Sequence, residues 1–145
     1  MPEGAYTILL VADSDDHATL IETALLRLRR FRIVSHVPDA VAAIDYLRRP
    51  SNLADRERFS LLPDIVVIDL NAPGCDHVDV LAWAQRRADR PALVIFSTPD
   101  RAVNRKLAEQ LRADLYEPNI SDPRTLDRFL HFAANIAEAR RRHGI

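Results

Sequence analysis

The chain has 145 residues, of which 48% are hydrophobic and 28% are charged, and its formal net charge is −1. This length and balance predict one soluble globular domain, large enough to bury a core without covalent staples. The near-neutral charge gives no electrostatic basis for nucleic-acid binding. The single cysteine, Cys75, excludes an internal disulfide and a cysteine-cluster metal site. The sequence has no signal peptide and no membrane-spanning run, so we expect a cytoplasmic protein with no membrane partner.

Several common catalytic motifs are missing from the sequence. Its three glycines, at positions 4, 74 and 144, are too dispersed for a G-x-G-x-x-G loop or a P-loop. The five histidines form no H-E-x-x-H pair, and there is no G-x-S-x-G nucleophile elbow. These observations exclude P-loop nucleotidases, dinucleotide-binding enzymes, zincin-type proteases and α/β-hydrolases.

The first third of the chain alternates apolar strands with amphipathic helices. We predict a strand over residues 7–12, a helix over 16–30, a second strand over 31–37 and a second helix that opens at Pro38. Proline at a first helical position is typical of a helix start. The positions expected to face inward share helical spacing: Ile21, Ala24, Leu25 and Leu28 in the first helix, and Val41, Ile44 and Leu47 in the second.

The remainder of the chain continues this alternation. Residues 50–62 are polar and lack a sustained period, which predicts an extended surface loop. Further strands are predicted at residues 64–70, 92–97 and 114–116, and further helices at 78–88, from 98 past 111, and from 123 to 142. The last helix follows a Ser-Asp-Pro cap and has five expected inward positions: Leu126, Phe129, Leu130, Ala133 and Ile136.

Five strands that alternate with five helices predict an α/β fold with a parallel sheet covered on both faces. The expected topology is (βα)5, flavodoxin-like, with strand order 2-1-3-4-5, which brings the carboxyl ends of the first and third strands together at the topological switch point. The sequence shows no internal repeat and no second domain, so residues 1–145 are predicted to form one domain.

Acidic residues follow the two strands that meet at this point. Asp69 ends the apolar run 65–68, and Asp13 ends the first strand. A carboxylate at the end of a buried strand is costly unless something compensates it. Because carboxyl ends of parallel strands share one edge, the two carboxylates would converge into a hard-oxygen site that suits Mg²⁺. The alternative for the acids after the first strand is to cap the next helix or lie in its first turn, which is the role we assign to Asp15 and Asp16.

The chain resembles the receiver domain of two-component response regulators from about residue 6 to residue 139. The resemblance rests on four segments at strand ends: residues 8–13, 63–74, 94–98 and 113–116. The pattern Asp-Leu-Asn-x-Pro that starts at Asp69, with the long loop before it, is similar to the small stand-alone regulators that partner phytochrome-type histidine kinases.

This resemblance implies a phosphoacceptor protein rather than an enzyme. Asp69 would attack the phosphorus of a kinase phosphohistidine. Mg²⁺ would be held by the carboxylates of Asp13 and Asp69 and by the backbone carbonyl of Asn71, since a cation offsets the repulsion between carboxylate and phosphoryl group. Ser97 would donate a hydrogen bond to a phosphoryl oxygen, and Tyr116 would swing inward as the switch aromatic. Taken alone, Ser97 fits a strand-end or capping hydroxyl better, and it is its place in the family pattern that favours the switch role. Tyr116 fits an ordinary half-exposed aromatic equally well.

Two positions lack the charged residue of the family pattern. Ala12 stands where members carry the first of two adjacent acids, and Asn119 stands where they carry a lysine. Shifting the alignment places Glu117 at the lysine position, so neither alignment supplies a cation. Because one acid is missing, we expect weaker Mg²⁺ binding. Because charge-assisted hydrogen bonds are about twice as strong as neutral ones, the missing lysine leads us to expect weaker coupling of phosphorylation to the output surface. The alternatives are a docking module that works without phosphorylation and, disfavoured by the missing glycine loop, a flavodoxin-like ligand binder.

The resemblance also implies how such a protein signals. We expect no output domain after the last helix, so the protein would act by contact with a sensor histidine kinase, with a target or with a second copy. The family usually signals through the fourth helix, fifth strand and fifth helix. Phe132 falls off the apolar stripe of the last helix and is either an exposed contact or a core-edge aromatic.

Overall fold

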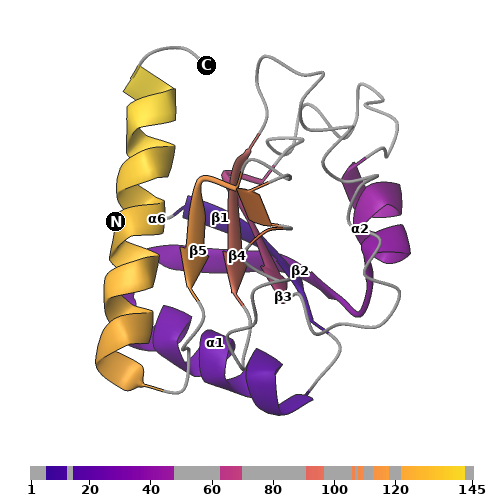
Figure 1. The fold of residues 1–145 in the computed structure, drawn as a ribbon, viewed down its shortest axis with the longest axis horizontal. Helices are drawn as coiled ribbons and strands as arrows, with labels where there is room; N and C mark the ends of the chain where they lie inside the picture. The colour runs from indigo at the N-terminus through magenta and orange to yellow at the C-terminus, as the bar shows by residue number, and fades with distance from the viewer. Residues whose placement is uncertain are drawn as a thin grey trace.

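A five-stranded parallel sheet in the order β2-β1-β3-β4-β5 forms the centre of the computed structural model (Figure 1). The structure describes residues 6–12, 15–47, 63–69, 91–96, 106, 108–109, 113–117 and 122–142. The strands are β1 (Tyr6–Val11), β2 (Phe31–Val37), β3 (Ile65–Asp69), β4 (Ala92–Phe96) and β5 (Leu115–Glu117). The predicted α/β class, the parallel sheet and the strand order are confirmed.

Three helices pack on this sheet within the described residues: α1 (Asp15–Leu28), α2 (Ala40–Leu47) and α6 (Pro123–Arg142). Residues 106, 108 and 109 are also helical, in agreement with the helix predicted there. The predicted loop at 50–62 and the predicted helix at 78–88 lie outside the described residues. None of the helices that can be described is long and apolar enough to cross a membrane.

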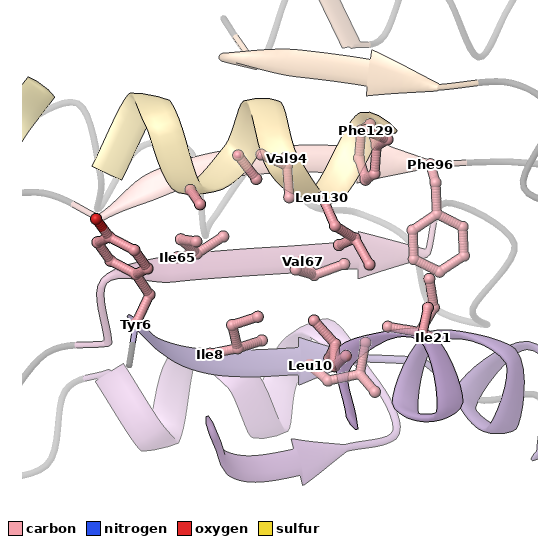
Figure 2. Packing of buried hydrophobic residues seen from close by; sticks show 14 of the residues in the cluster. Tyr6, Ile8, Leu10, Ile21, Ile65, Val67, Val94, Phe96, Phe129 and Leu130 are labelled. Atoms are coloured by element: carbon pink, nitrogen blue, oxygen red, sulfur yellow. The ribbon is translucent and has the colours of Figure 1, made fainter. Parts of the chain in front are cut away.

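Two apolar clusters flank the sheet. One joins α1 and α6 to the alternate strand residues Ile8, Leu10, Ile65, Val67, Val94 and Phe96, all of them almost fully buried. In Figure 2, Leu130 of α6 and Ile21 of α1 point into this cluster. The other cluster packs α2 against the intervening strand residues, which include Leu9, Val66 and Ile95. Every residue of β3 and β4 is buried, as expected for central strands of a parallel sheet covered on both faces.

The start of α2 differs from its prediction. The helix begins at Ala40, and Asp39 caps it by accepting a hydrogen bond from the backbone N–H of Ala42 at 2.9 Å. Pro38 therefore lies before the helix rather than at its first position. The inward face is carried by Ala43 and Leu47, whereas Val41, predicted to face inward, is 68% exposed. The apolar pattern alone did not separate the two faces of so short a helix.

The end of α1 also differs, because the helix stops at Leu28 rather than at residue 30. Arg29 adopts a φ of 57°, in the left-handed region, and its N–H still bonds to the carbonyl of Leu25 at 3.3 Å. A residue in this conformation is a common helix terminator. The predicted inward residues of α1 are confirmed: Ile21, Ala24 and Leu25 are buried, and Leu28 packs at the edge of the cluster.

Carboxylates fasten the amino-terminal edge of the sheet. Asp64, just before β3, accepts hydrogen bonds from both the N–H and the hydroxyl of Thr7 on β1. Asp114, just before β5, accepts one from the N–H of Leu93 at 2.7 Å and another from Arg140 of α6 at 2.8 Å. These contacts fix the relative height of neighbouring strands, and so the positions of their opposite, carboxyl ends.

Candidate functional site

Asp69 is the last residue of β3 and is completely buried. It is the one charged side chain that is fully withdrawn from solvent in the part of the chain that the structure describes. Buried carboxylates in proteins are paired, hydrogen-bonded or bound to a metal, because an isolated one is strongly disfavoured. Its burial at a strand's carboxyl end, rather than in mid-strand, places it where parallel sheets form ligand sites.

The ends of the neighbouring strands meet at Asp69. Val11 of β1 is in register with Ile68, so Ala12, the residue after Val11, reaches the level of Asp69. On the other side, Asp69 is in register with Phe96, the last residue of β4. The predicted convergence of strand ends around Asp69 is therefore present, with Ala12 only 1% exposed beside it.

Tyr116, the proposed switch aromatic, lies in β5 opposite Ile95 of β4. It is partly buried and packs against the apolar cluster on the α2 face, together with Ala113. An aromatic side chain at the rim of a core can shift between more and less buried positions without opening the core. The observed placement agrees with that role but does not test the switching itself.

The other predicted site residues, Asp13, Asn71, Ser97 and Asn119, lie outside the described residues. In the part of the chain that the structure describes, no group of three or more histidine, cysteine or acidic side chains could hold a metal ion. Asp69 is thus the one proposed Mg²⁺ ligand whose position is defined, and a buried carboxylate is the hard oxygen donor that such an ion requires.

His36 of β2 was not singled out from the sequence, yet it contacts this edge of the sheet. Its Nε2 lies 2.9 Å from the carbonyl oxygen of Ala12, and its Nδ1 lies 3.9 Å from a carboxylate oxygen of Glu22 on α1. A carbonyl only accepts hydrogen bonds, so Nε2 carries the proton. The available signal was a polar aromatic ring at the penultimate position of β2, the strand beside the one that ends just before Ala12.

No protein-family model matches the chain. Among curated proteins, it is 32% identical over 120 residues to the probable methanogenesis regulatory protein FilR2 of Methanothrix harundinacea, an alignment that covers 80% of this chain and 74% of that protein.

Among solved structures, the chain is similar to the response regulatory domain of mrkE from Klebsiella pneumoniae, with a TM-score of 0.72, 16% identity and coverage of 92% and 98% of the two chains. It is also similar to the phosphorylated cyanobacterial phytochrome response regulator RcpA, with a TM-score of 0.63, 26% identity and coverage of 92% of both chains. The Mn²⁺-bound form of response regulator Rcp1 matches with a TM-score of 0.63 and 22% identity over 90% and 91% of the chains.

The strand order, the buried acid at the end of β3 and these similarities agree. The chain belongs to the response-regulator receiver family, and its structural neighbours include phytochrome response regulators.

Proposed function

We propose that this protein is a phosphoacceptor receiver that takes a phosphoryl group on Asp69 from a sensor histidine kinase. The complete burial of Asp69 at the end of β3 carries the proposal, because the fold leaves a carboxylate where a structural role would favour an apolar residue. In the transfer, a carboxylate oxygen of Asp69 attacks phosphorus, and the bond from phosphorus to the kinase imidazole breaks, with that imidazole as leaving group. The protein itself acts as acceptor and not as an enzyme.

A divalent cation belongs to this proposal. Bound Mg²⁺ would offset the negative charge shared by the acceptor carboxylate and the phosphoryl oxygens. Its ligands would be the carboxylates of Asp13 and Asp69 and the carbonyl of Asn71. The Mn²⁺-bound form of Rcp1, a protein of the same fold, supports a divalent site of this kind.

The two departures from the family pattern would determine how strongly the site binds the phosphoryl group and how far phosphorylation shifts the protein toward its active arrangement. Ala12 offers no carboxylate, and Asn119 offers an amide where a cation is usual. The amide can still donate a hydrogen bond to a phosphoryl oxygen, and Ser97 would donate another. Because neutral bonds are roughly half as strong as charge-assisted ones, phosphorylation would stabilise the active arrangement less, and Tyr116 would respond less completely.

Contact with other proteins is the proposed output. The kinase partner is of phytochrome type by analogy with RcpA and with the bacteriophytochrome response regulator AtBRR, both of which have the fold found here. A second copy is the other proposed partner, bound through the surface of the helix that includes residues 106, 108 and 109, β5 and α6. On this surface Phe132 is 50% exposed, which fits a contact residue better than a core-edge one.

The first experiment incubates the protein with Mg²⁺ and acetyl phosphate and follows its intact mass. We expect a phosphate-sized gain in the wild type and none in Asp69→Asn, since an amide cannot act as the nucleophile. Circular dichroism of the variant controls for folding. The same measurement with phytochrome-type kinases as donors covers receivers that ignore small phosphodonors.

A docking module that works without phosphorylation is the competing function, and the departures at Ala12 and Asn119 favour it. It predicts no mass gain with any donor and no Mg²⁺-dependent change in the protein. Mass gain retained in Asp69→Asn would contradict both hypotheses, because one places the phosphoryl group on Asp69 and the other predicts no phosphorylation.

A further inference from the structure

We propose that His36 is a positioning residue of the phosphoacceptor site, and that its imidazole holds the carboxyl end of β1 at the level of Asp69. The proposal rests on the proposed function, because it assigns His36 a task only if this edge of the sheet binds a cation and a phosphoryl group. The role of His36 is a separate inference, because neither the residues at positions 12 and 119 nor the placement of Asp69 implies by itself that His36 takes part.

The backbone ladder between β1 and β2 ends next to the site. Among the described residues, its last bond runs from the N–H of Ala12 to the carbonyl of Val37, at 3.0 Å. In a continuing parallel ladder, the carbonyl of Ala12 would then accept from the N–H of residue 39. The chain instead leaves the sheet after Val37, and Asp39 becomes the cap of α2. The Nε2–H of His36 takes over as donor to this carbonyl, at 2.9 Å.

An irregularity in β2 puts His36 on the correct face for this contact. The register passes from Ile8 opposite Ile33 to Leu9 opposite Ser35, so one extra residue of β2 is inserted there. After the shift, His36 stands opposite Leu10, whose side chain belongs to the cluster under α1 and α6. A one-residue change of register sends each side chain to the other face. Without the insertion, position 36 would point away from α1.

Glu22 of α1 lies on the other side of the ring. Its carboxylate is 3.9 Å from Nδ1, and the two side chains are 42% and 34% exposed. The neutral tautomer that carries its proton on Nε2 and the protonated ring both donate from Nε2. The bond to Ala12 therefore persists in either protonation state. Glu22 forms an ion pair with the ring only when the ring is protonated.

The hydrogen bond holds the carbonyl group of Ala12, the residue that precedes Asp13 in the sequence. Ala12 follows Val11, which is in register with Ile68, so it lies at the level of Asp69. Asp13 is the second proposed carboxylate ligand. A receiver that lacks an acid at position 12 has fewer charged groups to order this strand end around a cation. The imidazole supplies that order from the neighbouring strand. Partners that orient metal ligands in this indirect way typically change metal affinity 10- to 100-fold when they are removed.

The test compares the full-length wild type with His36→Ala, His36→Phe and His36→Gln, with Arg32→Ala as control. Gln places an amide N–H near the position of Nε2, Phe keeps the ring without a donor, and Arg32 is an exposed residue of the same strand. Mg²⁺ titrations followed by NMR give dissociation constants, and the carbonyl ¹³C shift of Ala12 without Mg²⁺ reports its hydrogen bond directly.

We expect the Mg²⁺ dissociation constant to rise roughly tenfold in His36→Ala and His36→Phe. In His36→Gln it should stay close to the wild-type value, and in Arg32→Ala it should not change. The Ala12 carbonyl shift should move upfield in the Ala and Phe variants and return in Gln. Phe preserves the test if the Ala variant does not fold.

Equal Mg²⁺ affinity in the wild type and in the Ala and Phe variants would overturn the proposal, and so would an equal loss in all three variants. A wild type that neither binds Mg²⁺ nor gains phosphate would instead refute the proposed function. The Ala12 carbonyl shift then decides separately whether His36 orders this strand end: an unchanged shift in His36→Phe refutes that role, and a shift rescued by Gln supports it.

Discussion

Arg29 shows how a single residue can hold a costly conformation in this fold. Its φ of 57° lies in the left-handed region, where a side chain's Cβ crowds the following carbonyl. Glycine has no such penalty and is the usual residue at this place after a helix. Arg29 is exposed, so the position does not depend on packing of its side chain in the core.

Replacing Arg29 by glycine should therefore stabilise the protein. The relief of strain, about 1–2 kcal/mol, exceeds the added flexibility of the unfolded chain and leaves a net gain of roughly 0.5–1 kcal/mol. Urea unfolding of the wild type and Arg29→Gly measures the difference. Arg29→Ala is the matched control, since it removes the same side chain but keeps the strain. Equal stabilisation by both substitutions would show that the side chain and not the backbone is responsible.

At the scale of the element, the amino-terminal end of α6 is capped by a side chain. Asp122 precedes the helix, and its carboxylate accepts hydrogen bonds from the hydroxyl of Thr125 at 2.9 Å and from the N–H of Arg124 at 3.1 Å. The bond from Thr125, followed by the one from Arg124, lowers the pKa of Asp122 below its usual value. The same helix supplies six buried residues to the larger apolar cluster: Leu126, Phe129, Leu130, Ala133, Ala134 and Ala137.

The cap makes the free energy of unfolding depend on pH in the acid range. Because the pKa of Asp122 is lower in the folded state, the unfolded chain binds the proton first, and stability rises with pH in this range. The contribution is complete above the ordinary aspartate pKa of about 3.9, and it is lost as pH falls through the lowered value. Urea unfolding between acid and neutral pH should show a flatter profile for Asp122→Asn, which still caps but does not titrate. An identical slope would exclude this residue as a source.

The sequence predicted most elements because their apolar patterns were long or dense. The inward face of α6 followed from helical spacing over twenty residues, and Ile136 packs at its edge as expected. The four apolar residues before Asp69 predicted a strand buried on both faces, which β3 is. The predicted start and inward face of α2 were partly wrong, because eight residues with a mostly apolar composition give a weak periodic signal. The predicted end of α1 was wrong, because the pair Arg29-Arg30 gives no sign in the sequence that Arg29 adopts a positive φ.

The whole molecule shows why Asp69 was predictable and His36 was not. Asp69 follows from one local pattern combined with the rule that parallel strands present their carboxyl ends together. The contact of His36 depends on three things that act over longer distances: the inserted residue in β2, the departure of the chain into α2 and the packing of α1. None of these has a pattern in the sequence around residue 36.

The last prediction concerns self-association of the whole protein. Phe132 is half exposed on α6, on a helix whose opposite side is buried against the sheet. In a two-fold dimer the same patch serves both partners, so Phe132 would meet its counterpart or the neighbouring surface of β5. Exposed aromatic residues are the usual anchors of such interfaces. Phe132→Glu should therefore weaken dimerisation roughly tenfold or more, because it removes the anchor and places two like charges across the axis.

Sedimentation velocity over a concentration series, with and without the phosphoryl mimic beryllofluoride, measures this effect. Leu26→Glu is the matched control, because Leu26 is 77% exposed on α1 and lies outside the proposed surface. Weakening by Phe132→Glu alone would assign the interface to α6. Equal weakening by both variants would point to a general effect of added charge, and a wild type that stays monomeric in both states would refute the dimer. Contact with the kinase or a target would then be the only proposed output of phosphorylation at Asp69.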